Sequence, residues 1–197
     1  MVEYKNSDNI VVEESKRKKK ASDPITMPEL IRMCIGYGLL ILAIVVIFNK
    51  VLMLNLIPSG SMEKTIMTGD IVIATRYDVD EIERFDIVVF IPPDNRETYY
   101  IKRVIGLPGE TVLVYDGDVY INGTKIDNSF IPEPMGRSGD GEYVVPDGCY
   151  FMMGDNRNHS LDARYWTNKF VPHEDIVAKA KFTIFPFSRF GSVEYAD

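Results

Sequence analysis

The sequence predicts a mostly β protein, in which an antiparallel β domain follows one N-terminal transmembrane helix. Three observations predict this fold class: a long uncharged stretch near the N-terminus, short runs rich in valine, isoleucine, tyrosine and phenylalanine from Asp70 onward, and turn residues between those runs. The chain has 197 residues, of which 46% are hydrophobic and 26% are charged. This size and composition allow one ordinary domain with an appendage, and they exclude a wholly disordered, collagenous or coiled-coil chain.

The appendage is a predicted transmembrane helix at residues 30–49. Residues 33–48 carry no charge, and with the residues before them, where Arg32 can extend toward the headgroups, the stretch approaches the roughly 30 Å of a bilayer core. A buried core helix is one alternative, but Gly36 and Gly38 suit lipid better than a helix in water. A cleaved signal peptide is the other, and no Ala-x-Ala-like cleavage site follows the stretch.

Flanking charges predict how the chain is oriented and divided. Five consecutive basic residues at 16–20 precede the helix, whereas Lys50 alone follows it closely. By the positive-inside bias, the N-terminus is expected in the cytoplasm. We therefore expect a basic cytoplasmic segment at 1–29, the transmembrane helix at 30–49, and an extracytoplasmic β domain at 50–197.

The β domain is expected to begin close to the membrane surface. Residues 51–57, apolar except for Asn55, are expected to leave the bilayer along its outer surface. Asp116-Gly117-Asp118 and Asn122-Gly123 are hairpin signals. Glycine and proline gather between residues 127 and 141, which predicts a long connection within the domain. The expected strands are residues 71–74, 86–91, 99–105, 111–115, 119–121, 143–145, 149–153 and 178–185.

The charge balance argues against a nucleic-acid partner. The formal net charge is −7, and residues 58–197 contain 14 basic and 23 acidic side chains, whereas phosphate binding needs clustered lysine and arginine. The two cysteines, Cys34 and Cys149, lie in an apolar and a polar region respectively. A disulfide framework is therefore not expected, and no Cys/His zinc pattern is present. We expect no metal and no cofactor.

The first candidate catalytic segment is Pro58-Ser59-Gly60-Ser61-Met62. A serine beside glycine in a turn can expose its hydroxyl and leave backbone N–H groups free to point at one spot. A nucleophile with an oxyanion hole requires this arrangement. Ser-Gly-Ser is also ordinary turn chemistry, so the segment alone does not decide between a site and a turn.

Lys102 is the second candidate, because a serine hydroxyl needs a base. The two histidines are poor bases here, since His159 abuts a serine in a loop and His173 follows a proline in a polar stretch. Lys102 lies in an apolar run that can remove water from an ammonium and lower its pKa below the usual value of about 10.4. A lysine in an amphipathic strand more commonly extends to water, and this alternative stays open from the strand pattern alone.

The third segment is residues 154–164, a polar loop directly after the apolar run 151–153. If the loop is buried, its donors and acceptors must satisfy one another, which gives either a structural network or a site. A solvated loop is the simpler alternative. A metal site is a further one, although its spacing matches no familiar metal-binding loop. The candidate ligands of that site would be Asp155, Asn156, Asp162 and His159.

Four ordered blocks behind one membrane anchor make the sequence distinctive. The blocks are Pro58-Ser59-Gly60-Ser61-Met62, Thr68-Gly69-Asp70-Ile71-Val72, Ile101-Lys102-Arg103-Val104-Ile105-Gly106-Leu107-Pro108-Gly109, and Met153-Gly154-Asp155-Asn156-Arg157 continuing to Ser160, Asp162 and Arg164. With these blocks the chain resembles the bacterial type I signal peptidases, which are membrane-anchored Ser-Lys endopeptidases that remove signal peptides from exported preproteins. The resemblance covers nearly all of the chain from about residue 30.

The resemblance implies a role for each residue of these blocks that carries chemistry. Ser61 would be the nucleophile, and Lys102 would be the general base and later the acid for the leaving amine. The Ser61 backbone N–H and the Ser59 hydroxyl would form the oxyanion hole, and Ser160 would hydrogen-bond and orient the lysine. The residues that would brace the site are Arg103, Asp155, Asp162 and Arg164.

The resemblance also implies the partners and the fold of the outer domain. The partners would be exported preproteins, cut after small-x-small sequences, and the lipid bilayer. The fold would be a mostly β domain with an exposed apolar surface that dips into the bilayer. Lys64 stands where the family usually has proline, and the last block departs from the common pattern without losing a catalytic atom. The departures in that block are Asn158, His159 and Ala163.

Two other functions remain as alternatives. The first is a membrane-anchored β domain that only binds exported or envelope proteins, and the presence of both hydroxyls and the lysine disfavours it. The second is a Ser-Lys self-cleaving enzyme of the repressor type, which acts in the cytoplasm. The anchor and its expected orientation disfavour this second function.

Overall fold

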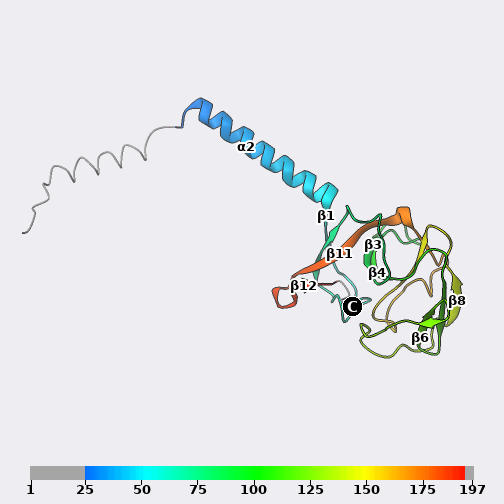
Figure 1. Ribbon diagram of the computed structural model, residues 1–197. Helices are drawn as coiled ribbons and strands as arrows, with labels where there is room; N and C mark the ends of the chain where they lie inside the picture. The colour runs from blue at the N-terminus through cyan, green and yellow to red at the C-terminus, as the bar shows by residue number, and fades with distance from the viewer. Residues whose placement is uncertain (1–24, 194–197) are drawn as a thin grey trace, which may run out of the picture. The chain divides into compact units, whose positions relative to one another are not determined.

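The computed structural model describes residues 25–193 (Figure 1). The chain divides into two compact units, one that ends at Val45 and one that begins at Val46. The first unit holds the apolar helix and the second holds all the strands among these residues. The basic run at 16–20, from which the orientation was predicted, lies outside the described residues.

The apolar helix α2 (Met27–Val46) is followed by a single π-helical turn, η1 (Ile47–Val51). Its residues are all exposed, and the helical stretch of 25 residues to Val51 is long and apolar enough to cross a membrane. The helix begins three residues before the expected residue 30, because Thr26 and Glu29 cap it. Both the backbone N–H and the hydroxyl of Thr26 donate to the Glu29 carboxylate at 2.9 Å, as in one half of a capping box.

The second unit contains two antiparallel sheets, which confirms the predicted mostly β fold class. The order of strands in the main sheet is β1-β2-β11-β3-β4-β9-β10, with β12 paired to β11, and the order in the second sheet is β7-β6-β5-β8. The main sheet comprises β1 (Leu52–Leu56), β2 (Ile71–Thr75), β3 (Ile87–Phe90), β4 (Tyr100–Gly106), β9 (Cys149–Met153), β10 (Val171–Pro172), β11 (Ile176–Phe185) and β12 (Gly191–Ser192). The second sheet comprises β5 (Thr111–Tyr115), β6 (Asp118–Ile121), β7 (Thr124–Lys125) and β8 (Gly141–Val144).

The expected strands are all present with shifts of up to two residues at their ends, but β1 and the two-residue strands β7, β10 and β12 were not expected. Residues 51–57 were interpreted as a segment along the membrane surface, whereas Leu52–Leu56 pairs with β2, with Asn55 opposite Val72. A strand at the membrane surface is compatible with both descriptions, but the run alone does not indicate a pairing partner. The expected connection at 127–141 is confirmed, because β7 ends at Lys125 and β8 begins at Gly141.

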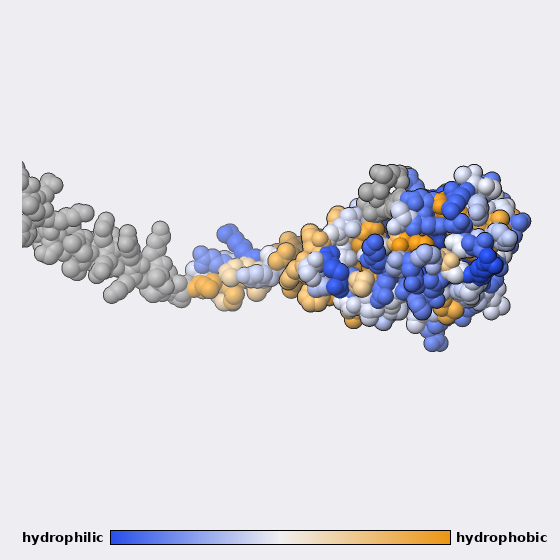
Figure 2. Space-filling view, turned by 90° about the horizontal axis from the view of Figure 1, so that it is seen from below, coloured by the Kyte–Doolittle hydropathy of each residue, from blue (hydrophilic) through white to orange (hydrophobic). Residues whose placement is uncertain are grey.

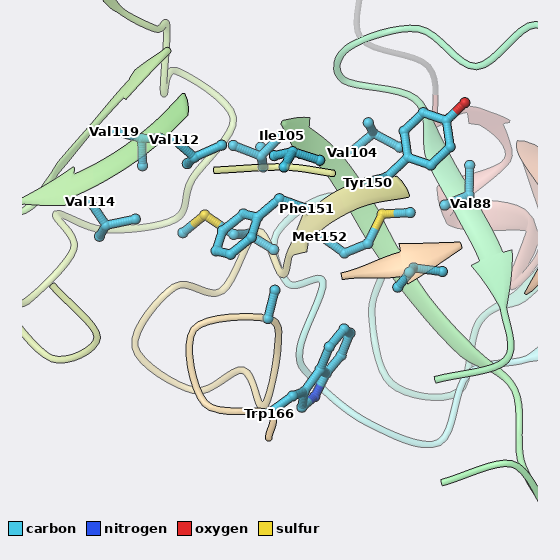
Figure 3. Close-up of a cluster of buried hydrophobic side chains, with 14 of the residues drawn as sticks. Val88, Val104, Ile105, Val112, Val114, Val119, Tyr150, Phe151, Met152 and Trp166 are labelled. Carbon is cyan, nitrogen blue, oxygen red and sulfur yellow. The ribbon is translucent and has the colours of Figure 1, made fainter. Parts of the chain in front are cut away.

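The main hydrophobic core joins the two sheets. Val112 and Val114 of β5 pack toward Ile105 of β4 and toward Phe151 and Met152 of β9 (Figure 3). The side chains of Val112, Val114, Phe151 and Met152 are fully buried, and such packing holds strands in fixed positions. Residues on β4 and in the loop that follows β9 are therefore carried by rigid elements.

Large apolar side chains are also exposed on the β unit. Figure 2 shows apolar residues in patches on the face of this unit that it displays. Those on β1, on β11, and within or beside the short helix η3 (Phe187–Arg189) are Leu54, Leu56, Phe182, Phe185, Phe187 and Phe190. Exposed apolar groups of this size suit contact with a membrane or a partner better than contact with water.

Candidate active site

The loop that carries Ser61 is fixed by the residue after it. The side chain of Met62 is fully buried in a second apolar cluster that includes Ile57, Ile66 and Val72. The Ile66 backbone N–H donates to the Met62 carbonyl at 2.9 Å, which makes a helical turn after the serine. Ser61 is consequently held on a rigid turn rather than on a free loop. Only 7% of the residue is exposed.

Lys102 lies against Ser61. It is carried by β4, its exposed fraction is 4%, and its Nζ lies 2.6 Å from the Ser61 Oγ. The Nζ also donates to the Ile101 carbonyl at 3.1 Å. Burial lowers the pKa of Lys102 to about 8, because water no longer stabilises the ammonium, and the more distant Asp162 and Asp155 carboxylates oppose this shift. About a tenth of the amine is therefore neutral at pH 7 and can accept a proton.

Ser59 lies on the exposed side of the same turn. Its hydroxyl donates to the Ser61 Oγ at 3.5 Å, which is a long contact. Gly60 lies between the two serines, and a Cβ there would lie 2.6 Å from the Glu63 Oε1, so a side chain at this position would require the Glu63 carboxylate to move.

Ser160 lies beside this pair but does not bond the lysine as the resemblance implies. The hydroxyl of Ser160 is buried and has no hydrogen-bond partner among residues 25–193. It lies over Gly154, where an added Cβ would be 2.2 Å from the Ser160 Oγ and 2.4 Å from the Ser61 carbonyl oxygen. The rotamer of Ser160 thus places its Oγ against the backbone of Gly154 and away from hydrogen-bonding reach of Nζ.

Two buried ion pairs hold the loop after β9, and they contain the four predicted bracing residues. Arg103 donates from Nε and Nη2 to the two Asp155 oxygens at 2.8 and 2.7 Å. Arg164 donates to Asp162 in the same way, at 2.8 and 2.9 Å. The Gly154 backbone N–H also donates to Asp162 at 3.0 Å. Both carboxylates are therefore committed to arginine, and no cluster of metal-ligating side chains occurs in the described chain.

Asn156 and Arg157 are positioning residues that the sequence analysis left without a role in the proposed chemistry. The Asn156 backbone N–H donates to the Ser61 carbonyl at 3.1 Å, and its side-chain amide donates to the Gly60 carbonyl at 3.0 Å. Arg157 is buried and donates from Nε to the Gly154 carbonyl at 3.1 Å. Only the fold reveals these contacts, because they join segments about 95 residues apart or depend on burial of an arginine.

Asn158, one of the departures, joins the loop after β9 to the long connection. Its amide nitrogen donates to the Glu133 Oε1 at 2.8 Å, and its Oδ1 accepts from the Gly136 backbone N–H at 2.8 Å. The neighbouring His159 is exposed. Asn158 therefore has a structural explanation, whereas Lys64 is exposed on the nucleophile turn and nothing in the structure explains it.

The serine and the lysine open into a cavity of about 520 Å³. Its lining includes Ser59, Ser61, Lys102, His159 and Leu161. A pocket of this volume admits several side chains of a peptide. Because a buried serine hydroxyl beside a neutralisable amine is the arrangement of a Ser-Lys hydrolase, the fold and site define the class as a β-domain serine hydrolase.

Comparison with known proteins identifies the family within this class. A profile of the family described as signal peptidase, peptidase S26, matches residues 30–185. The chain is 37% identical over 192 residues to a probable signal peptidase I-2 of Synechocystis, covering 94% of this chain and 85% of the relative. The chain belongs to the signal peptidase family, peptidase S26, and is a serine peptidase.

A second curated relative agrees with this assignment. A signal peptidase I of Bacillus caldolyticus is 36% identical over 145 residues, covering 66% of this chain and 78% of the relative. A solved signal peptidase I from Enterococcus faecalis is 32% identical and matches with a TM-score of 0.43, covering 50% of this chain and 96% of that structure. The family profile and the curated relatives confirm the prediction from the four blocks at the level of the family.

Proposed function

We propose that the protein is a membrane-bound endopeptidase that removes N-terminal signal peptides from exported preproteins, with Ser61 as nucleophile and Lys102 as general base. The observation that carries the proposal is the 2.6 Å contact between Ser61 Oγ and Lys102 Nζ, made by an amine whose pKa burial lowers to about 8. The names of the relatives supply the substrate class, since each is a signal peptidase I.

The reaction is an acyl transfer in two stages. Lys102 Nζ takes the Ser61 proton as Oγ forms a bond to the scissile carbonyl carbon. The C–N bond then breaks, and Nζ returns the proton to the leaving amine. In the second stage Nζ takes a proton from water, the hydroxide attacks the ester carbon, and the Ser61 Oγ leaves with the proton from Nζ. A neutral amine is therefore required at the start of each stage.

The negative oxygen of each tetrahedral intermediate needs donors. We assign these to the Ser59 hydroxyl and the Ser61 backbone N–H, which the resemblance names. The position of Ser59, 3.5 Å from the Ser61 Oγ on the exposed side of the turn, supports this assignment. A donor that meets charge developing in the transition state contributes about 3 to 4 kcal/mol. Cleavage after small-x-small sequences is likewise proposed from the resemblance.

The membrane arrangement follows the sequence prediction. Residues 30–49 are proposed to cross the bilayer, with residues 1–29 in the cytoplasm and residues 50–197 outside. The length and composition of the apolar helix support the anchor, and the exposed apolar side chains of β1, β11 and η3 suit a domain that works against the headgroups. A site tethered at that depth meets the cleavage position of a membrane-bound substrate at high effective concentration.

The test is cleavage of a preprotein by the detergent-solubilised full chain. A preprotein with an Ala-x-Ala site is expected to give one new N-terminus directly after that site, and the Ser61→Ala variant is expected to give none. A serine-directed acylating probe is expected to label the wild type and not this variant. Absence of both cleavage and labelling in the wild type would favour a β domain that only binds exported proteins.

Protease accessibility separates the proposal from the self-cleaving alternative. In sealed vesicles of known orientation, the β domain is expected to be digested from the extracytoplasmic side. Protection from that side would support a cytoplasmic enzyme of the repressor type instead.

A further inference from the structure

Arg76 and Lys50 lie where the apolar helical stretch ends. This stretch ends at Val51, and the Arg76 backbone N–H donates to the Val51 carbonyl at 2.9 Å. The bond continues the pairing of β1 with β2, in which Leu52 lies opposite Thr75. Lys50 directly precedes Val51. Both cationic residues therefore lie within one residue of this bond.

The two side chains have no partner of their own. Neither forms a hydrogen bond or an ion pair with residues 25–193. The Arg76 Nε is also buried from water, and a buried donor without a partner is rare in native proteins. The two positive charges are thus available to a group outside the chain.

A shortage of carboxylates does not explain these unpaired charges. Residues 58–197 contain 23 acidic and 14 basic side chains, and most arginines of the β unit form an ion pair with a carboxylate. These arginines are Arg84, Arg96, Arg103, Arg137, Arg164 and Arg189. Arg157 is the other exception, and its buried guanidinium lies 5.5 Å from the centre of the Phe130 ring. The exception at Arg76 therefore reflects its place beside the helix end and not the composition of the domain.

The carboxylate nearest to Arg76 along the chain has other partners. Asp78 accepts a hydrogen bond from the Thr75 hydroxyl at 2.7 Å and forms an ion pair with Lys181 at 3.1 Å. The charge of Asp78 is balanced by Lys181, so it does not neutralise Arg76.

The surroundings of Arg76 and Lys50 suit a lipid headgroup. Residues 30–49 are proposed to cross the bilayer, so Val51 and the arginine bonded to it lie at the level of the headgroups. Tyr77 is 68% exposed beside Arg76, and tyrosine is typical of this interfacial layer. A planar guanidinium presents paired N–H groups that match phosphate oxygens, and Lys50 adds a second charge. The ligand that fits both is a phosphodiester with a net negative charge.

We propose that Arg76 and Lys50 form a binding site for the phosphate of an anionic phospholipid headgroup. The proposal rests on the proposed membrane span at 30–49 and not on the proposed peptidase chemistry. Inorganic phosphate offers similar oxygens, but a bilayer presents lipid phosphates at this level at a far higher effective concentration.

One strand connects this site to the nucleophile turn. β1 begins directly after Val51 and ends at Leu56, two residues before Pro58. Its five residues span about 17 Å in extended form. A lipid bound at Arg76 fixes one end of β1 at the headgroups, and so sets the depth at which the nucleophile turn works.

The test measures which lipid contacts this part of the β unit in a bilayer. The full chain is reconstituted in phosphatidylcholine vesicles that contain phosphatidylglycerol as a minor component. Traces of both lipids carry the same photoreactive group beside the glycerol backbone, and mass spectrometry distinguishes and maps their cross-links. In the wild type, residues 50–54 and 75–78 are expected to cross-link to phosphatidylglycerol about tenfold more than to phosphatidylcholine, because each cation strengthens the binding of an anionic lipid. Both probes are in one sample, so a loss of folded protein cancels in this ratio.

Charge-removing variants and a matched control place the preference at the two cations. Lys50→Gln combined with Arg76→Gln is expected to reduce the ratio to about twofold. Lys125→Gln combined with Arg137→Gln removes the same two charges from exposed side chains on β7 and the long connection, and is expected to keep the wild-type ratio. Arg76→Lys keeps the charge and is expected to stay within about threefold of the wild type.

Three results would overturn the proposal. The first is a wild type that cross-links equally to both lipids, and the second is a ratio that the double variant of Lys50 and Arg76 leaves unchanged. The third is an Arg76→Lys variant that loses as much as Arg76→Gln, since the arginine would then have only a structural role.

Free phosphate and the membrane span are tested in the same vesicles. Inorganic phosphate is expected to reduce the phosphatidylglycerol cross-links no more than sodium chloride does at equal ionic strength, and a larger loss would assign the site to free phosphate instead. If residues 30–49 also lack cross-links, the proposed span fails and this site with it. Since no substrate is present, none of these failures bears on the proposed peptidase activity, and an inactive peptidase would leave the lipid site standing.

Discussion

Two buried lysines occupy the same row of the main sheet and have opposite surroundings. Lys102 on β4 and Lys179 on β11 are both paired in register with Val88 of β3, one from each side. Their exposed fractions are 4% and 8%. Lys179 Nζ forms an ion pair with Asp86 at 2.7 Å and donates to the Glu81 carbonyl at 2.9 Å, whereas Lys102 Nζ contacts the Ser61 hydroxyl and the carbonyl of its neighbour on β4.

The difference shows that burial alone does not make a lysine a base. A buried ammonium beside a carboxylate is stabilised by the opposite charge, whereas one beside a hydroxyl is not. Asp162 and Asp155 are the carboxylates whose charges act on Lys102, but both are bonded to arginine. The two carboxylates in the loop after β9 are therefore paired with arginine and not with Lys102, whereas Asp86 forms an ion pair with Lys179. We expect chemistry at Lys102 and stability from Lys179.

The largest expected effect is on cleavage. Lys102→Met should abolish processing of a preprotein, with a loss of about 10⁴-fold or more, because the Ser61 hydroxyl loses its base. Lys179→Met, its matched control, should keep kcat within about threefold once the amount of folded protein is measured. Comparable losses in both variants, or none in either, would break the comparison. The readout is the rate at which the new N-terminus appears.

The second effect concerns the serine on the exposed side of the turn. Ser59→Ala should lower kcat by about 10²- to 10³-fold with a small change in KM, because a donor to the oxyanion acts mainly in the transition state. Ser188→Ala is the control, since Ser188 is exposed on η3 and does not line the cavity. Steady-state kinetics that show an unchanged kcat in Ser59→Ala would remove Ser59 from the mechanism.

The third effect is the pH dependence of the reaction. Since the amine must be neutral and its pKa is about 8, kcat/KM should fall about tenfold for each unit below that value and level off above it. The Lys179→Met variant should show the same midpoint, because Lys179 takes no part in the proton transfer. A profile that is flat between pH 6 and 9, measured as kcat/KM on a preprotein, would contradict the proposed base.

The smallest expected effect is on stability, and it should have opposite signs in the two variants. Lys179→Met leaves Asp86 without its partner and should lower the free energy of unfolding by about 2 to 3 kcal/mol. Lys102→Met should raise it by about 1 to 3 kcal/mol at pH 7, because a pKa lowered from 10.5 to about 8 corresponds to a cost of about 3 kcal/mol for the protonated lysine.

The direction in which this stability difference changes with pH follows from proton binding at Lys102. Between pH 8 and 10.5 the unfolded chain binds more protons at Lys102 than the folded one, so stability falls as the pH drops through this window. The advantage of Lys102→Met should therefore be largest below pH 8 and should shrink above pH 10. Denaturant unfolding in detergent at both ends of this range measures it, and an advantage that does not depend on pH would contradict the cause.

The sequence was sufficient to predict most of the strands and the two principal site residues, Ser61 and Lys102. It was not sufficient to predict which residues contact them. Lys102 was selected because it lies in an apolar strand, yet Lys179 follows Ile176 and Ala178 in a run of the same kind. Only the tertiary contacts separate them, since Asp86 comes from another segment of the chain. Asn156 escaped notice for the same reason, because its two contacts with the nucleophile turn depend on the approach of distant loops.

The sequence analysis missed other details because one sequence pattern can fit two structures. The apolar run 51–57 was expected only along the membrane surface, and its pairing with β2 as strand β1 was missed because the run itself does not indicate a partner strand. The start of α2 depends on the cap formed by Thr26 and Glu29, which a count of uncharged residues does not detect. Ser160 was assigned a bond to the lysine by resemblance, and its rotamer in the structure leaves that bond unmade.

Titration of the Lys102 side chain itself is the most direct measurement. The full chain, labelled with ¹³C at lysine Cε and held in detergent micelles, gives one NMR resonance per lysine, and comparison with Lys102→Met and Lys179→Met assigns the two buried ones. The resonance that disappears only in Lys102→Met should titrate with a midpoint near pH 8. A midpoint above 10 would mean that the amine stays charged at neutral pH, and the serine would have no base.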